Sequence, residues 1–375
     1  MNRHRRAVRR EFGFTLIELM IGVLIGALSS LVIAKVFAFS EAQRRATTSG
    51  SDAQVNGALA LYSIQRDAQM AGYGLTSSLD ALGCEIRAQF NGNNFTWTLA
   101  PILITAGANG APDSIGFLSS LTTRYSAPTL VMVDHPRTAA NFFTNTTIGI
   151  GQSDLMIAVP RTIDANNWCS VFDVTGIGGG NGQGQGQGQG QNQVLHNSGA
   201  NGPWNQPGGQ TIFPNAGYPA GSYLLNLGTM NSRTYSISAG NALQLTTFNT
   251  ASATSWTAEI FPGIVQLQAF YGKDTDGDGV IDTYDKVTPA TNANWRQVLA
   301  VRIAVAARSG QFEKEDVTPA DLLWNVGTTV PVTGAATCGA SKCVTLKVSQ
   351  LADWKRYRYR VYDVVVPVRN LLWHE

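Results

Sequence analysis

The pattern of hydrophobic and polar positions divides the chain into a helical beginning and a β-rich remainder. Between Gly13 and Lys35 the only charged residue is Glu18, and an apolar run follows it from Leu19 to Ala34. A helix rises ~1.5 Å per residue and needs about 20 residues to cross a bilayer. Residues 14–39 are therefore expected to form one membrane-spanning helix, with the basic segment 1–13 held in the cytoplasm.

The helical pattern continues over residues 40–72 and becomes amphipathic. Val55, Leu59 and Tyr62 fall at i, i+4 and i+7, which predicts the face that packs on a globular head. Other small or apolar residues broaden this stripe, namely Ala58, Leu61 and Ala68, and charged residues lie mostly off it, namely Arg44, Arg45, Asp52, Arg66 and Asp67. The sequence Gly72-Tyr73-Gly74 is expected to end the helix.

Residues 73–375 are predicted to form a large, antiparallel β-rich head. Short β-prone runs alternate with Gly, Asn, Pro and Ser. The expected strands are 97–104, 114–118, 129–133, 155–159, 170–174, 223–227, 234–238, 242–246 and 261–271. Residues 295–310 predict a short helix followed by a strand. The Gly-Gln repeats within 176–193 predict a flexible loop, because they supply no core side chains. A phosphate-binding glycine loop would need a strand, a helix and a GxGxxG spacing that are not found there.

The segment from Arg356 to Arg369 predicts a long strand with period 2. Arg356, Arg358 and Arg360 alternate with Tyr357, Tyr359 and Val361, which would place arginines on one face and aromatics on the other. The arginine row is interpreted as the solvated face of a sheet, and a surface for nucleic acid or an acidic partner is the alternative.

A run of acids after residue 273 has the spacing of a twelve-residue calcium loop. It places acids at positions 1, 3, 5, 9 and 12, glycine at position 6 and a carbonyl at position 7. The expected Ca²⁺ ligands are Asp274, Asp276, Asp278, Val280, Asp282 and Asp285. Aspartate in place of glutamate at position 12 departs from the usual pattern. We expect a structural ion at 274–285, and a solvated acidic turn is the alternative.

Composition and motifs exclude several other functions. The formal net charge is +2 and only 14% of residues are charged, so no nucleic-acid partner is predicted. The chain contains four histidines and no GxSxG, HExxH or GxxxxGK[ST] motif, so we do not expect an enzyme. A membrane-anchored periplasmic hydrolase with paired carboxylates remains an alternative, because such pairs leave no short signature.

The hexapeptide Gly13-Phe14-Thr15-Leu16-Ile17-Glu18, preceded by a basic leader and followed by an apolar helix, resembles the signal of type IV prepilins and type II secretion pseudopilins. The resemblance implies cleavage after Gly13 by a prepilin peptidase and methylation of Phe14. It also implies that Glu18 neutralises the terminal amine of a neighbouring subunit, a partner that a carboxylate in an apolar segment needs. A secretory signal peptide cleaved near Ala27-Leu28-Ser29 is the alternative.

Two further stretches resemble the PilW type of minor pilin, related to the J-type pseudopilins. They are Gln65 to Gly74, at the end of the helix, and the carboxy-terminal runs Trp295 to Gly310, Val317-Thr318-Pro319 and Tyr357 to Asn370. The resemblance implies an α+β, type IV pilin-like fold with a long helical stem.

The same resemblance implies a subunit that primes assembly of a pilus and sits near its tip, supporting an adhesin-like protein. The implied partners are other minor and major pilins and the inner-membrane assembly platform, with the chain in the inner membrane before assembly and in the extracellular fibre afterwards. A type II secretion pseudopilin is the alternative, and a head that is itself the adhesin is another.

Four cysteines fit the oxidising compartment that this topology supplies. Three connectivities are possible. Cys338 and Cys343 are close in sequence, so we pair them and leave Cys84 with Cys169. A four-cysteine zinc site is less favoured because no CxxC pair is present.

Overall fold

The computed structural model describes residues 13–75, 78–121, 127–178, 192–198, 202–205 and 212–372. Its first element is helix α1, Leu16–Met70, which ends before Gly72 and Gly74, two glycines with positive φ. The predicted helix and its end are therefore confirmed. The chain divides into two compact units, Met1–Asp52 and Ala53–Glu375. The second unit thus begins inside α1, and not at residue 73, where the sequence placed the start of the head.

The face of α1 that packs within the second unit is only partly the predicted one. Ala68 is buried and Leu61 packs against the core, as expected, but the three central positions of the stripe are exposed. The predicted positions Val55, Leu59 and Tyr62 are 54%, 46% and 61% exposed. The buried positions are mostly small, namely Ala53, Gly57, Ala60, Ile64, Ala68 and Ala71. Small side chains let the helix backbone approach the strands closely, whereas the larger residues fit only on the outer side.

Asp67 lies on this buried face, although the sequence placed it mostly off the packed stripe. Its two carboxylate oxygens accept hydrogen bonds from Nη1 of Arg233 at 3.0 and 2.9 Å. The hydroxyl of Tyr235 donates to the same carboxylate at 2.6 Å. Burial, first of all, raises the pKa of the Tyr235 hydroxyl, which keeps it protonated as the donor. Asp67 can be buried because Arg233 and Tyr235 donate hydrogen bonds to its carboxylate.

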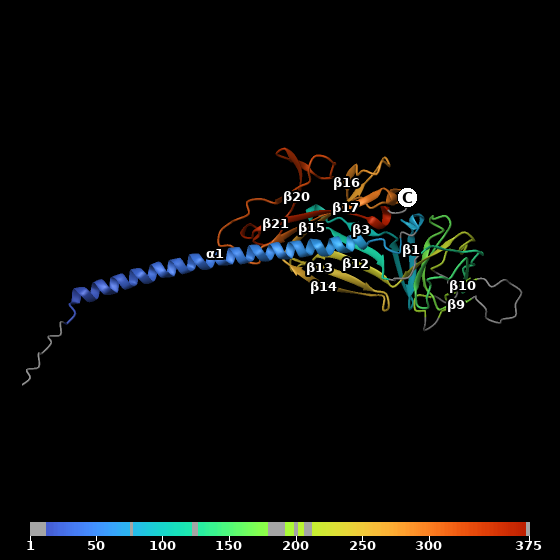
Figure 1. The fold of residues 1–375 in the computed structure, drawn as a ribbon, viewed down its shortest axis with the longest axis horizontal. Coiled ribbons are helices and arrows are strands. Elements are labelled where there is room, and N and C mark those ends of the chain that lie inside the picture. The colour runs from blue at the N-terminus through green and yellow to red at the C-terminus, as the bar shows by residue number, and fades with distance from the viewer. Residues whose placement is uncertain are drawn as a thin grey trace, which may run out of the picture. The chain divides into compact units, whose positions relative to one another are not determined.

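A five-stranded antiparallel sheet packs one face against this part of α1 (Figure 1). Its strands, in spatial order, are β14 (Thr254–Pro262), β13 (Ala242–Asn249), β12 (Met230–Ile237), β4 (Ser114–Ser120) and β3 (Ile102–Thr105). Ile115, Tyr235 and Leu245 share a core with Ala60 and Ile64 of the helix.

A four-stranded sheet continues the same core. Its order is β16 (Thr283–Asp285), β15 (Ile264–Lys273), β17 (Val298–Arg308) and β21 (Tyr359–Pro367), with the short helices α2 (Asn292–Arg296) and α3 (Arg369–Leu372) beside the ends of β17 and β21. The helix and strand predicted within 295–310 are confirmed as α2 and β17. The predicted strand 261–271 is wrong at its start, because Gly263, with φ 76°, makes a turn between β14 and β15.

The long arginine-bearing strand is also shorter than predicted. Arg356 ends a 3₁₀ turn, Trp354–Arg356, and Arg358 precedes β21, so only Arg360 of the three lies in the strand. Segment 309–318 runs beside residues 356–358 and forms hydrogen bonds with backbone groups that would otherwise bond to a neighbouring strand. The N–H of Ser309 donates to Arg358 O, and the N–H of Glu313 donates to Arg356 O. Arg358 also pairs with the Glu313 carboxylate at 3.0 Å.

The remaining strands form one six-stranded sheet and two small ones. The large sheet has the order β2 (Asn93–Thr98), β1 (Glu85–Phe90), β8 (Cys169–Asp173), β7 (Leu155–Val159), β11 (Tyr223–Gly228) and β5 (Thr129–Leu130). The small sheets contain β6 (Asn141–Thr144), β10 (Asn192–Leu195) and β9 (Gly176–Gly178), and β18 (Leu322–Asn325), β20 (Ser341–Leu346) and β19 (Ala336–Cys338). Strands β1 and β8 run parallel, which the expectation of an antiparallel head did not include.

Two loop and strand predictions need correction. The predicted strand 97–104 is divided between two sheets, because Pro101 has no N–H to donate to a ladder. The ends of the predicted loop 176–193 are strands β9 and β10, which pair with each other, and the Gly-Gln repeats between them lie outside the described residues.

Candidate functional site

The residues of the expected processing site lie at the beginning of α1. Gly13 and Phe14 precede the helix, and both are exposed. Thr15 and Glu18 form a capping box, an arrangement that satisfies free N–H groups at the first turn of a helix. Oε2 of Glu18 accepts from the N–H of Thr15 at 3.0 Å and from its hydroxyl at 2.9 Å, and Thr15 Oγ1 accepts from Glu18 N at 3.3 Å. The single subunit therefore satisfies Glu18 locally.

Thr15 was not among the expected site residues, although the sequence carries a signal for its role. Thr followed three residues later by Glu, just before an apolar run, is the spacing of a capping box.

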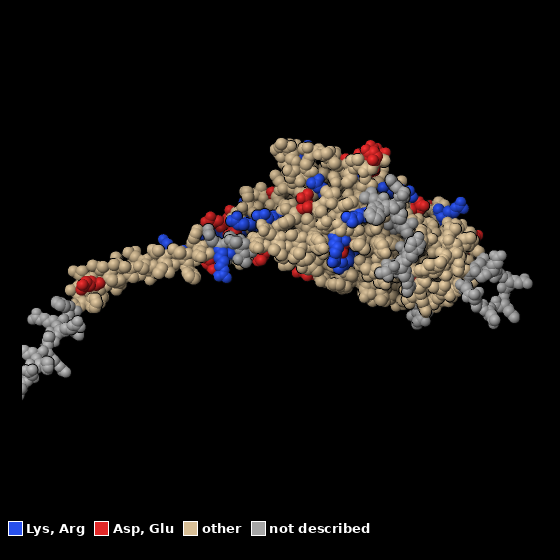
Figure 2. Space-filling view, viewed as in Figure 1, with Lys and Arg blue, Asp and Glu red and all other residues tan. Residues whose placement is uncertain are grey.

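The helix that follows is long and apolar enough to cross a membrane over Leu16–Glu41. Side chains 14–40 are all exposed in the isolated chain. In Figure 2 the surface of this segment is almost entirely uncharged. It is a candidate membrane anchor.

The acidic loop lies between β15 and β16 and brings together three of the five expected carboxylates. Ligand atoms of Asp274, Asp276 and Asp282 lie within 4.8 Å of one another. Asp274 accepts from the N–H of Gly277 and from that of Gly279, at 2.6 and 2.8 Å. These two glycines have positive φ, so they allow the turn that folds the loop around this carboxylate.

The three acids differ electrostatically. The backbone N–H groups, that of Gly279 first, lower the pKa of Asp274, and the hydroxyl and N–H of Thr275 lower the pKa of Asp282. The N–H of Asp278 stabilises the Asp276 carboxylate, but repulsion from the neighbouring carboxylates outweighs it and raises the pKa of Asp276. A divalent cation would relieve this repulsion, so the three acids fit Ca²⁺ chemically.

Asp278, Val280 and Asp285 do not join the cluster as expected. Asp278 accepts a hydrogen bond from the N–H of Val280, whose side chain is exposed. Asp285 lies in β16 and pairs with Lys273 Nζ at 2.7 Å. The β15–β16 hairpin thus places Asp285, the expected last ligand, beside a lysine and not beside the other three acids.

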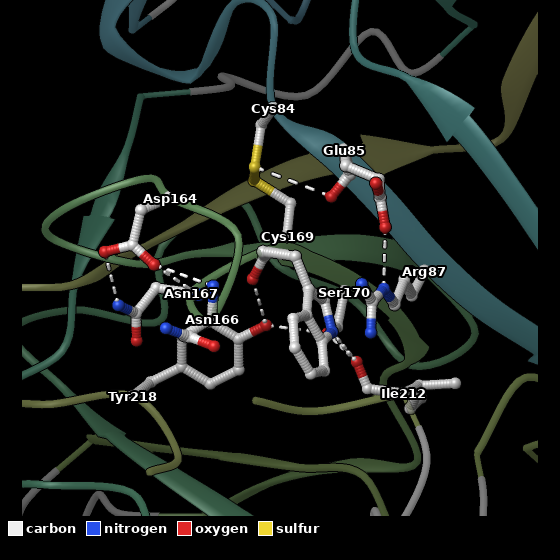
Figure 3. Close-up of polar contacts among 11 residues, drawn as sticks. Cys84, Glu85, Arg87, Asp164, Asn166, Asn167, Cys169, Ser170, Ile212 and Tyr218 are labelled. Carbon is white, nitrogen blue, oxygen red and sulfur yellow. Dashed lines mark hydrogen bonds and ion pairs between the residues drawn. A yellow bond between two sulfur atoms is a disulfide. The ribbon is translucent and has the colours of Figure 1, made fainter. Parts of the chain in front are cut away.

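Both disulfides have the expected pairing, Cys84 with Cys169 and Cys338 with Cys343. The first joins the residue before β1 to the start of β8, next to the parallel pairing of Ile86 with Cys169 (Figure 3). Beside it, Arg87 lies over the ring of Trp168 at 3.5 Å. The Cys84–Cys169 disulfide therefore holds together two strands that are distant in sequence.

Two of the four histidines meet in the core of the head, which the sequence did not indicate. Nε2 of His135 lies 2.9 Å from Nε2 of His196. His135 also stacks on Phe142 with ring centroids 3.7 Å apart. Burial lowers the pKa of His135 to about 4, and burial together with repulsion from His135 lowers that of His196 to about 3. Both imidazoles are therefore neutral at pH 7.

A hollow of about 450 Å³ beside Trp204 contains one carboxylate, Asp173, which accepts from the N–H of Trp204. Burial raises the pKa of Asp173 to about 6. Glycosidic hydrolysis of the usual kind needs two converging carboxylates. Among the described residues that line this hollow, Asp173 is the only carboxylate, so the pair that this reaction uses is not found there.

Two family profiles match the chain. The profile for type IV pilus-assembly protein W matches residues 233–370, from β12 to α3, and the prokaryotic N-terminal methylation motif matches residues 8–34. No curated protein and no solved structure matches the chain. The matched families point to a structural pilus component and not to an enzyme. The profiles matched at the two ends of the chain are consistent with a prepilin-like minor pilin of the PilW type, associated with type IV pili.

Proposed function

We propose that this minor pilin primes assembly of a type IV pilus and lies near the tip of the fibre. Prepilin peptidase would cut after Gly13 and expose the amine of Phe14 for methylation. The carboxylate of Glu18 would then exchange its bonds to Thr15 for the terminal amine of a neighbouring subunit. The observation that carries the proposal is an apolar helical segment, Leu16–Glu41, whose side chains are exposed from residue 16 to residue 40.

The second half of α1 supports the same proposal. Val55, Leu59 and Tyr62 face away from the sheet that covers the other side of the helix. An exposed apolar stripe of this kind indicates a surface for another protein. We infer that stems of neighbouring pilins cover it in the fibre, and that the head selects those neighbours and supports an adhesin-like tip protein.

The test of the assembly role is a comparison of Glu18→Ala and Glu18→Gln with the unchanged chain. Both variants are expected to reach the membrane fraction, because the apolar segment is intact. Both should be depleted from sheared pili in immunoblots, because neither can neutralise an amine. The control is Glu41→Gln, beyond most of the apolar run. Incorporation of Glu18→Gln at the normal level would refute the proposed role.

Mass spectrometry of the amino terminus tests processing separately. We expect a mature chain that begins with N-methylated Phe14. A mature chain that begins at any other residue would exclude the assembly mechanism, whatever the result for Glu18. Crosslinking of the stem through cysteines placed at Val55 and Tyr62, compared with a cysteine at exposed Lys347 in the head, would identify the neighbouring subunits.

We also propose that the acidic loop binds Ca²⁺ through Asp274, Asp276 and Asp282 and thereby stabilises the β15–β16 hairpin. Millimolar Ca²⁺ should raise the melting temperature of the full chain, because an ion bound only to the folded state adds to its stability. Asp274→Ala should abolish the shift, whereas Asp285→Asn should preserve it. Equal melting temperatures with calcium and with a chelator would refute this proposal.

A further inference from the structure

The open face of the five-stranded sheet differs sharply in chemistry from the face that packs on α1. In register, Leu103, Gly116, Thr234 and Thr246 lie directly opposite one another on neighbouring strands, so their positions share one face. The adjacent row, Ile104, Ile115, Tyr235 and Leu245, belongs to the buried core. The open face is therefore rich in small and hydroxyl-bearing residues.

Several hydroxyls on this face are free to bond a ligand. The hydroxyls of Thr105, Ser114, Ser232 and Thr234, and that of Thr98 on neighbouring strand β2, make no hydrogen bond to any residue in the described part of the chain. A hydroxyl can both donate and accept, so a row of free hydroxyls suits a ligand that also carries hydroxyl groups. A sheet face made to pack on another layer would instead be apolar.

Aromatic rings of strand β2 border the same face. Two adjoining hollows, of about 240 and 170 Å³, share Trp97, Met230, Ser232 and Thr234. Phe95 and Phe248 line the second hollow and contact each other edge to face, with centroids 6.4 Å apart. Together the hollows make one groove on the scale of ordinary ligand sites, which hold ~300–1,000 Å³.

The floor and the charge of the groove restrict its ligand further. Gly116 leaves the floor low: a Cβ there would stand 3.2 Å from Oγ1 of Thr234. None of the described residues that line either hollow is charged. An ionic ligand would find no counter-charge in the groove, and a purely apolar ligand would leave the hydroxyls unpaired.

We propose that this groove binds a neutral saccharide, with the ring of Trp97 stacked on the apolar face of a sugar ring and the free hydroxyls bonded to sugar hydroxyls. Uncharged pyranoses combine the two surfaces that the groove presents, an apolar ring face and a hydroxyl rim. The ligand class thus follows from aromatic walls, free hydroxyls and the missing charge taken together.

The test is titration of the full chain, in a detergent without a sugar headgroup, with maltoheptaose, cellohexaose and chitohexaose, followed by tryptophan fluorescence and saturation-transfer NMR. Polygalacturonate serves as the charged comparison, and an extended uncharged peptide as the protein-like one. We expect saturable binding of at least one neutral oligosaccharide and of neither comparison. Failure of all three neutral probes at millimolar concentration, or binding of the peptide instead, would overturn the proposal.

Variants test the residues. Trp97→Ala should weaken binding by about tenfold or more, and Thr234→Val by about threefold to tenfold, which is the usual worth of one hydrogen bond. The matched controls are Trp256→Ala, which removes an exposed tryptophan from the same sheet outside the groove, and Thr345→Val on β20. Gly116→Val fills the floor and should abolish binding, and its melting temperature is measured alongside to show that the variant is folded. Equal affinity in Trp97→Ala and Trp256→Ala would refute the assignment.

Discussion

The buried pair His135 and His196 should make the head sensitive to acid. Their Nε2 atoms lie 2.9 Å apart, so one ring donates to the other and both are neutral. Phe142 and Phe213 surround them, together with Tyr218, whose hydroxyl donates to Ser170 at 2.7 Å. A proton added to either ring would place a charge in an aromatic core, next to the other ring.

The direction and size of the effect follow from linkage between protonation and folding. The pKa values in the folded state, about 4 and about 3, lie below the ordinary histidine value of 6.5. The unfolded chain therefore binds protons first, and stability is complete above pH 6.5 and falls as the pH drops below it. A pH of 5 lies 1.5 units below the pKa of each histidine in the unfolded chain. Protonation of the unfolded chain therefore lowers the free energy of unfolding by about 2 kcal/mol for each histidine.

Asp173 opposes part of this loss. Its folded pKa of about 6 lies above the ordinary 3.8, so the folded state binds the extra proton and gains stability as the pH falls through 6. Between pH 7.5 and 5 this gain is about 1 kcal/mol. The free energy of unfolding is therefore expected to fall by about 3 kcal/mol over that interval from these three groups.

Urea unfolding of the full chain at pH 7.5, 6 and 5, followed by tryptophan fluorescence, measures this change. The double variant His135→Gln with His196→Gln keeps a polar pair that cannot titrate, so its stability should rise slightly towards pH 5. Asp173→Asn should steepen the loss to about 4 kcal/mol. If the double variant loses as much stability as the unchanged chain between pH 7.5 and 5, the reasoning is refuted.

Two further predictions concern the stem. Gly57→Ala should destabilise the second unit by about 1–3 kcal/mol, because the added Cβ would clash with the ring of Tyr362. Gly50→Ala, where the added Cβ has nothing within 4 Å, should be neutral or stabilising. Equal urea midpoints for the two variants would contradict the close packing. Asp67→Asn should cost about 3 kcal/mol, because it leaves Arg233 without its charged partner, whereas exposed Asp52→Asn should cost less than 0.5 kcal/mol, as measured by urea unfolding. A loss of the same size in both aspartate variants would show that the buried pair is not the cause.

Local patterns in the sequence were enough to establish the stem and much of the head. The apolar run indicates where α1 begins, and Gly72 and Gly74 indicate where it ends. Both signals are local, because helix formation and termination depend on neighbouring residues. Strand β7 has the predicted bounds, since five successive apolar residues between polar turns form a buried strand. The disulfide pairing also agrees, because one pair is local and only one partner remained for the other.

Only the tertiary structure decided which faces are buried and which distant residues meet. Residues 53 to 68 of α1 contain two stripes with the same helical spacing, one of alanine and glycine and one that includes Tyr62. Periodicity alone does not predict which of the two packs against the sheet. Asp285 belonged to the acid series by spacing, yet strand pairing places it beside Lys273. His135 and His196 are 61 positions apart and become neighbours only when their segments fold together. The spacing of residues along the chain determines which side chains share a face of one helix or strand. Contact between two elements depends instead on how closely their surfaces can pack, which only the folded structure determines.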